Sequence, residues 1–237
     1  MNPLGWLSLW RGVELTEAQR RRRDALPAPQ AVDDTPLHAV RFVVVDLETS
    51  GLDTQRDQLL SIGAVVIEKR AVDLTCQFER TLKRDDPPVN ESTLIHGIAP
   101  SELARGTAAD DALLEFFEFA GNCVFAAFHA PFDQRMLVRS ARDELGCRPQ
   151  HLFIDVAELA PLMVPEANLA DGKLDDWQAY FGLSNEQRHH AAADALATAQ
   201  IMLILLSRAH AQGIWTLAEL VARLHSRRSL RRTQAKM

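Results

Sequence analysis

The chain has 237 residues, of which 47% are hydrophobic and 24% charged, the balance of a globular protein rather than a disordered one. This length suits one catalytic-size domain with extensions. The formal net charge is −6, but residues 39–218 hold 15 basic and 26 acidic residues, whereas the two ends together hold 11 and 6. The acidic centre is consistent with a solvated surface or with a site in which carboxylates hold divalent cations.

Neither a membrane span nor secretion is expected. The longest apolar run near the C-terminus, Ile201 to Leu206, is much shorter than the roughly 20 residues of a membrane helix. The first ten residues lack a positive charge before their apolar stretch and lack a small-residue cleavage site. Cys76, Cys123 and Cys147 do not have the spacing of a zinc site or a disulfide framework. We therefore expect a cytoplasmic protein with free thiols.

Residues 1–38 predict an extension to the main domain. They contain an apolar segment with Trp6 and Trp10, a short helix over 14–24, and a linker with the sequence LPAPQAVDDTP. The basic run Arg20 to Arg23 in this helix is compatible with a solvated helix face, the more common case, or with contact to nucleic acid.

Residues 39–211 predict one α/β domain. Three β-branched runs, at 40–48, 59–69 and 72–83, are separated by short polar breaks and predict an antiparallel meander. Two later strands alternate with helices, which favours a mixed sheet covered by helices. These strands are expected at 123–128 and 151–156, and the helices at 92–96, 109–120, 131–145, 156–163, 173–181 and 191–210.

Residues 212–237 predict an amphipathic helix followed by a basic tail with the sequence HSRRSLRRTQAKM. Five basic residues with almost no apolar partners predict that this tail is disordered. The residues are Arg227, Arg228, Arg231, Arg232 and Lys236.

The first predicted strand closes with two acids. Asp46 and Glu48 are two residues apart, so in an extended strand their side chains point to the same face. Two carboxylates this close repel each other unless a cation or solvent compensates. The pair is consistent with exposed acids that enter a turn or with two metal ligands.

Two further groups of acids and histidines follow along the chain. Pro131 suits the first position of a helix, so Asp133 falls in the first turn, where free N–H groups and the helix dipole favour an anion. That placement is also compatible with a purely structural role. Further on, His189 precedes Asp194 by about 500° of helical rotation, so both can reach one cleft. The adjacent His190 offers the same chemistry at another angle.

Together these motifs resemble those of the DEDDh family of 3′-to-5′ exonucleases. DLETSGLD begins at Asp46, FD ends at Asp133, and HxxxxD runs from His189 to Asp194, in the family's order. The family includes the proofreading epsilon subunit of bacterial DNA polymerase III and, more distantly, RNase T and oligoribonuclease. Three further segments extend the resemblance: LIHGI at 94–98, FIDVAELAP at 153–161 and KLDDWQAYFGL at 173–183.

The resemblance implies a ribonuclease H-like fold, with three antiparallel strands followed by two parallel ones and flanking helices. It implies two divalent cations, Mg²⁺ or Mn²⁺, held by Asp46, Glu48, Asp133 and Asp194, and carboxylate oxygens suit such hard cations. Two cations of this kind stabilise both the attacking and the leaving oxygen when a phosphodiester is hydrolysed. His189 corresponds to the general base that takes the proton of the attacking water.

The resemblance also implies a pocket for the terminal nucleotide. Thr49 would bind the 3′-hydroxyl region through its backbone, and Leu52 would wedge against the terminal base. His96 and Phe132 would line the pocket. Leu52 and Phe132 are also compatible with ordinary core positions.

One departure from the family concerns the substrate. Many members carry His-Asn at five and four residues before the second-motif aspartate, where this chain has Phe128 and His129. His129 therefore replaces the family's Asn contact, or the contact is lost.

The resemblance predicts action on the 3′ ends of single-stranded or frayed DNA. Trimming of RNA is an alternative, because the choice depends on whether a 2′-hydroxyl fits the pocket. A non-catalytic, polymerase-associated module is a further alternative that the loss of a ligand would favour, but none of the four acids is lost. The two terminal extensions are candidates for contact with nucleic acid, a polymerase or another protein.

Overall fold

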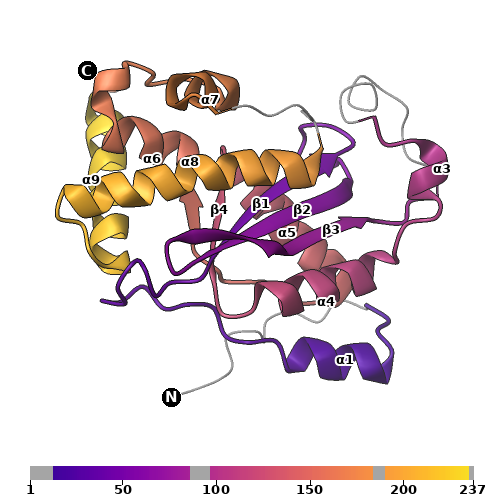
Figure 1. Cartoon of the computed structure of the whole chain (residues 1–237). Coiled ribbons are helices and arrows are strands. Elements are labelled where there is room, and N and C mark those ends of the chain that lie inside the picture. The colour runs from indigo at the N-terminus through magenta and orange to yellow at the C-terminus, as the bar shows by residue number, and fades with distance from the viewer. Residues whose placement is uncertain (1–12, 86–96, 184–189, 235–237) are drawn as a thin grey trace.

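The computed structural model describes residues 13–85, 97–183 and 190–234, and within them it confirms the predicted α/β architecture (Figure 1). Five strands form a mixed sheet in the order β3-β2-β1-β4-β5. The first three strands pair antiparallel, whereas β1, β4 and β5 run parallel. The strands are β1 (Phe42–Thr49), β2 (Leu59–Glu68), β3 (Ala71–Thr81), β4 (Val124–Ala127) and β5 (Phe153–Asp155).

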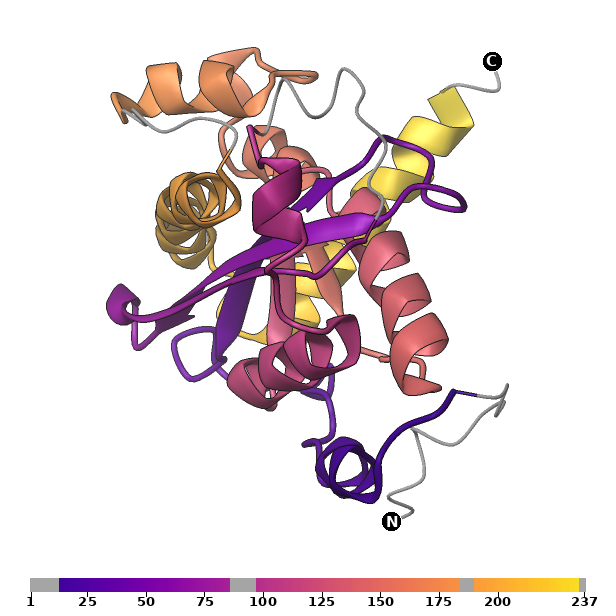
Figure 2. The same ribbon diagram turned by 90° about the vertical axis from the view of Figure 1, so that its right-hand side faces the viewer.

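Helices cover both faces of this sheet, as the view turned by 90° shows (Figure 2). The helices α6, α8 and α9 pack against one face, and α4 and α5 pack against the other. The helix predicted at 92–96 lies outside the described residues. The described helices are α1 (Glu17–Asp24), α3 (Pro100–Leu103), α4 (Ala109–Ala120), α5 (Pro131–Leu145), α6 (Val156–Met163), α7 (Leu174–Phe181), α8 (Ala191–Ala211) and α9 (Leu217–Gln234), with a short 3₁₀ helix, η1 (Pro165–Ala167).

The central strand β1 is buried on both sides, which explains its continuous apolar sequence. Phe42 and Val44 face the α8 side of the sheet, and Val43 and Val45 face α4 and α5. Because successive side chains alternate, Asp46 continues the row of Phe42 and Val44. The strand therefore delivers its first acid to the side on which α8 lies.

The helix α5 begins and ends where the sequence predicts. Pro131 occupies the first turn, where its missing N–H is not needed. Gly146 follows the helix with a φ of 67°, the left-handed conformation that commonly closes helices. These two signals bracket the helix and place Asp133 in its first turn.

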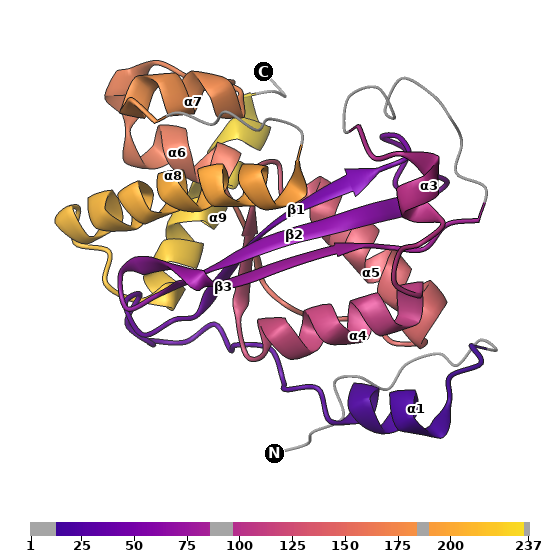
Figure 3. The same ribbon diagram turned by 45° about the vertical axis from the view of Figure 1, so that its right-hand side comes forward.

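The helix α8 is long and apolar enough for a membrane span by length and composition alone. Half of its most apolar stretch is buried inside the protein. The helix packs against β1 and β2 across one face of the sheet (Figure 3). This packing assigns α8 to the core of the domain.

The prediction of a disordered basic tail is wrong for the described part of that tail. The helix α9 continues to Gln234, after an apolar anchor that includes the buried Leu224. Beyond this anchor, Arg228 Nε lies 2.5 Å from Glu158 Oε2 of α6, and Arg227 donates to the Glu158 carbonyl at 3.2 Å. Because these arginines bind the neighbouring helix, the basic sequence extends an anchored helix.

The N-terminal helix α1 is also anchored on the domain. Thr16 caps it by accepting a hydrogen bond from the N–H of Gln19 at 3.2 Å. Arg22 Nε lies 2.8 Å from Glu118 Oε1 of α4, and Arg23 donates to the Leu145 carbonyl at 3.2 Å. Two arginines of the basic run therefore bind the domain itself.

A buried histidine makes the stability of the core depend on pH. His151 is 4% exposed, and its ring centroid lies 6.0 Å from that of Phe117 and 4.8 Å from that of Phe125. Burial lowers the pKa of His151 to about 4. Between about pH 4 and 6.5 the unfolded chain therefore binds a proton that the native state excludes. The free energy of unfolding is expected to fall as the pH drops through this window, by about 3 kcal/mol.

Urea unfolding at about pH 7 and about pH 4.5 measures this effect. The matched variant is His151→Phe, because a phenyl ring suits the aromatic neighbours and does not titrate. The unsubstituted chain should lose about 2–3 kcal/mol more stability between the two pH values than the variant does. An equal loss in both proteins would show that His151 is not the titrating group.

Candidate functional site

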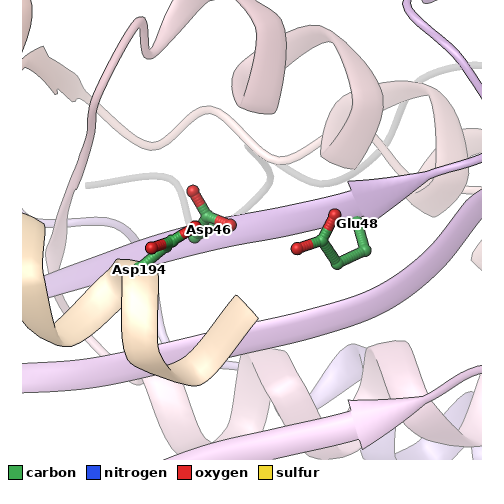
Figure 4. Close-up of side chains that lie close together, drawn as sticks. All are labelled: Asp46, Glu48 and Asp194. Atoms are coloured by element: carbon green, nitrogen blue, oxygen red, sulfur yellow. The ribbon is translucent and has the colours of Figure 1, made fainter. Parts of the chain in front are cut away.

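Three carboxylates converge near the C-terminal end of β1. Asp46 and Glu48 project from the strand, and Asp194 projects from the first turn of α8. One carboxylate oxygen of each lies within 4.8 Å of the other two. Figure 4 shows Asp46 and Asp194 close together, with Glu48 further along the strand. Asp194 is buried and the other two are half-buried, so three acids share a space with little solvent.

The approach of α8 to β1 depends on a glycine in β2. Gly63 is the partner of Asp46 in the antiparallel pairing. A Cβ on Gly63 would lie 2.1 Å from the carbonyl carbon of Ala191 and 2.2 Å from the nitrogen of Ala192. The missing side chain therefore lets the N-terminus of α8 rest on the sheet, which brings Asp194 to Asp46. The sequence motifs do not include Gly63, although a glycine inside an apolar strand signals close backbone approach.

The fourth predicted ligand, Asp133, reaches the same region from α5. Because β4 runs parallel to β1, the helix that follows β4 begins at the edge of the sheet where β1 ends. Asp133 is buried, and burial raises the pKa of its carboxyl well above the usual range. The neighbouring charges of Asp155 and Glu48 raise it further. Asp133 lies outside the group of three acids, but it is close enough to feel the charge of Glu48.

A buried carboxylate outside the predicted site holds the segment before Asp133. Asp155 ends β5 and caps α6, where its Oδ1 accepts from the N–H of Ala157 at 3.1 Å. The same oxygen accepts from the N–H of His129 at 3.1 Å. His129 has a φ of 64°, which is uncommon for a residue with a side chain. Asp155 therefore fixes the turn between β4 and α5. Its sequence signal was an aspartate directly before a helix.

Asp155→Ala is expected to lower nuclease turnover about 10-fold, because the start of the helix that carries Asp133 is no longer fixed. The free energy of unfolding should fall by about 1–3 kcal/mol, since two backbone N–H groups lose their acceptor. Asp155→Asn keeps the acceptor oxygen and should retain most of the turnover. Thr16→Ala removes a comparable cap from α1 and should leave turnover unchanged. Full activity in Asp155→Ala would exclude a positioning role.

The loop after β1 presents Leu52 to solvent. Leu52 is 85% exposed, which rules out the alternative of a core position. Asp57 braces the loop, because its two carboxylate oxygens accept from Ser50 Oγ at 3.0 Å and from the N–H of Asp53 at 2.8 Å. Arg139 of α5 donates to the Asp57 carbonyl. An exposed apolar side chain on a braced loop is available to contact a ligand.

The other predicted contact residues have different surroundings. Thr49 is buried at the end of β1, and its Oγ1 donates to the Gly51 carbonyl at 2.8 Å. Phe132 packs partly against the core, whereas His129 is exposed. His96 and His189 were also predicted, and both lie outside the described residues.

His190 is oriented toward β3. Its Nε2 lies 3.0 Å from Glu79 Oε1. Both residues line a cavity of about 130 Å³ that Glu48 also lines. His190 is therefore next to the acid cluster but already in contact with a carboxylate of β3.

The four acids form a donor set for hard cations. Carboxylate oxygens are the protein ligands that Mg²⁺ and Mn²⁺ prefer. A divalent cation would also compensate the repulsion among Asp46, Glu48 and Asp194, which lie within 4.8 Å of one another. The arrangement therefore fits divalent cations and chemistry on an anionic substrate.

A comparison with protein families identifies the domain that contains these acids. The exonuclease family model named for RNase T matches residues 43–202, a range that includes all four acids. The chain belongs to this exonuclease family. The family predicted from the DEDDh motifs is therefore confirmed, and the acid cluster lies in a nuclease domain.

Similar proteins include a DNA polymerase III and a protein that resembles one of its subunits. A DNA polymerase III of the PolC type from Caldanaerobacter subterraneus is 29% identical over 197 residues, which are 83% of this chain and 14% of that protein. A DNA polymerase III subunit epsilon-like protein from Rhodobacter capsulatus is 32% identical over 190 residues, which are 78% of this chain and 26% of that protein. The chain therefore spans only a small part of these relatives.

Solved exonuclease structures share the fold. E. coli exonuclease I in complex with a dT13 oligonucleotide has a TM-score of 0.61 and 16% identity, covering 73% of this chain and 42% of that one. Exonuclease X in complex with 5′-overhanging duplex DNA has a TM-score of 0.59 and 18% identity, covering 77% and 99%. These similarities confirm the ribonuclease H-like fold.

Proposed function

We propose that this chain is a metal-dependent 3′-to-5′ exonuclease that releases nucleoside 5′-monophosphates from single-stranded or frayed DNA ends. The observation that carries the proposal is the convergence of Asp46, Glu48 and Asp194 within 4.8 Å. Asp133 adds a fourth acid, whose pKa the charge of Glu48 helps to raise. Membership of the exonuclease family supports hydrolysis of phosphodiester bonds at this site.

In this proposal the four acids hold two divalent cations, Mg²⁺ or Mn²⁺. The bound cations supply positive charge for the attacking and leaving oxygens. The chain fixes its acids on three rigid elements, β1, α5 and α8, so that their geometry is preorganised. His189 accepts the proton of the attacking water, a role for which neutral imidazole is suited near pH 7.

The terminal nucleotide is proposed to bind beside the loop that carries Leu52. The exposure of Leu52 supports its role as a wedge, because an apolar side chain can replace the stacking that a terminal base loses. Thr49 would bind the 3′-hydroxyl region, and His96, His129 and Phe132 would line the pocket. The structures of exonuclease I and exonuclease X are complexes with DNA, which supports DNA as the proposed substrate.

Oligonucleotides with labelled 5′ ends test this function. DNA and RNA of the same sequence are incubated with Mg²⁺, Mn²⁺ or a chelator, and the products are sized. We expect DNA to be shortened stepwise from its 3′ end, only when a divalent cation is present. Shortening of RNA alone would assign the chain to RNA trimming. The absence of products from both would favour a non-catalytic module.

Substitution of the two neighbouring histidines tests which of them accepts the proton. His189→Gln is expected to lower single-turnover rates by about 10²-fold or more, the usual contribution of a positioned base. His190→Gln is the matched control and should retain most of the rate, because Nε2 of His190 already contacts Glu79 at 3.0 Å. A large loss in His190→Gln alone would assign the base to His190.

The proposed catalytic unit covers residues 39–211. The extensions at 1–38 and 212–237 are candidates for contact with a polymerase or another protein, since relatives of this domain are parts of DNA polymerase III. An enzyme that shortens the ends of nucleic acids together with a polymerase would work where the DNA is replicated. We therefore propose a cytoplasmic location.

A further inference from the structure

A second concave surface lies away from the acid cluster. A groove of about 660 Å³ is bounded by the C-terminal half of α8, the turn between β2 and β3, and the segments around Pro36 and Trp215. Figures 1 and 3 show this turn near the C-terminal half of α8. Asp194 lies at the other end of the helix, roughly 14–24 Å along its axis from the groove. The groove is therefore separate from the nuclease site.

The floor of this groove is apolar. Leu203, Ile204 and Leu206 of α8 line it and are only half-buried. Trp215, which follows α8, lies at the edge of the groove and is 53% exposed. A contiguous apolar surface of this kind is typical of grooves that receive an amphipathic segment.

The rim of the groove is basic. Lys69 and Arg70 are exposed along it, and the exposed His38 also lines the groove. The neighbouring carboxylate, Glu68, is paired with Arg41, with 2.9 Å between Oε1 and Nη1, so its charge is compensated. The whole chain has a formal net charge of −6, which makes this positive rim a local feature. Electrostatic complementarity favours a ligand that carries negative charge beside apolar groups.

The basic residues occupy turn positions that disfavour any residue with a Cβ. Lys69 and Arg70 form the two-residue connection between β2 and β3, with φ values of 51° and 65°. Two-residue hairpin turns with positive φ at both positions are best served by Asn-Gly. The chain therefore keeps two strained basic residues at the rim, and such strain points to a role other than folding.

We propose that this groove binds an acidic, amphipathic segment of a partner protein. Apolar side chains of the segment would pack on Leu203, Leu206 and Trp215, and its carboxylates would pair with Lys69 and Arg70. A protein segment is favoured over a small amphiphile because the similar domain of the PolC-type relative is 14% of a much longer protein. In that relative the similar domain is therefore joined to much further protein.

Selection from a phage-displayed library of random peptides of about 16 residues, with the full chain as the target, tests the proposal. We expect recovered peptides to combine Asp or Glu with Leu, Ile or aromatic residues. Their binding, measured by fluorescence anisotropy, should weaken as salt increases. Competition with laurate tests the alternative of a small amphiphile.

The double substitution Lys69→Asn with Arg70→Gly separates binding from folding. It installs the favoured turn residues, so the Tm should rise, while the recovered peptides should bind at least about 10-fold more weakly. Leu206→Glu places a negative charge in the floor and should also abolish binding. Lys83→Asn removes a basic charge elsewhere and should change nothing. Nuclease turnover should be unaffected by all three.

Four outcomes would overturn the proposal. These are the recovery of no peptide, the recovery of peptides without acidic residues, equal binding to the Asn-Gly variant, and tight binding of laurate in place of peptides. Because nuclease turnover is measured in parallel, failure of this proposal is distinguishable from failure of the proposed exonuclease function.

Discussion

Gly63→Ala is expected to lower nuclease turnover by at least about 10²-fold, although it adds only one methyl group. The new Cβ would lie 2.1 Å from the carbonyl carbon of Ala191. The helix α8 must then move away from β2, and Asp194 moves with it. Displacement of a catalytic group by about 1 Å is sufficient for a loss of this size. The effect is measured as turnover on 5′-labelled oligonucleotides and as the Mn²⁺ concentration for half-maximal activity. Turnover should fall, and this Mn²⁺ concentration should rise.

Val66→Ala is the matched control on the same strand. Val66 faces α4 and α5. Its truncation should lower the free energy of unfolding by about 1–2 kcal/mol without displacing α8. We expect this variant to have a lower Tm but nearly full turnover. Full turnover in Gly63→Ala would mean that the close contact between β2 and α8 is not needed to hold Asp194.

The elements that the sequence predicts well are those with local signals. Pro131 and Gly146 mark the two ends of α5 within the sequence itself. The tail of α9 has no such signal, because Arg228 acquires its partner Glu158 from a helix 70 residues earlier. The composition of the tail describes an isolated segment, whereas its structure depends on that distant contact.

The functional site likewise combines features with local sequence signals and features that depend on distant contacts. The types and order of Asp46, Asp133 and Asp194 are visible in the sequence, because the proposed hard cations favour carboxylate ligands. Their convergence is expected from the family resemblance but has no local signal of its own, because it depends on residues that carry no nuclease chemistry. Gly63 provides space for α8, and Asp155 holds the turn before α5. Both act through backbone atoms of distant segments, which a motif does not record.

Asp46→Asn is expected to reduce nuclease turnover by at least about 10³-fold, because one of the acids proposed to hold the cations is lost. The fold should be retained. Asp46, Glu48 and Asp194 lie within 4.8 Å of one another, so removing one negative charge lowers their mutual repulsion. The Tm of the variant without added metal should therefore equal or exceed that of the unsubstituted chain.

Thermal unfolding with and without Mn²⁺ tests the cation site independently of turnover. A cation that binds only the native state raises the free energy of unfolding, so Mn²⁺ should raise the Tm of the unsubstituted chain. It should raise the Tm of Asp46→Asn much less. Asp34→Asn removes an exposed acid elsewhere and should behave like the unsubstituted chain. If Mn²⁺ stabilised Asp46→Asn as strongly as the other two proteins, the cation would bind at a different place and the acids of β1 would need another role.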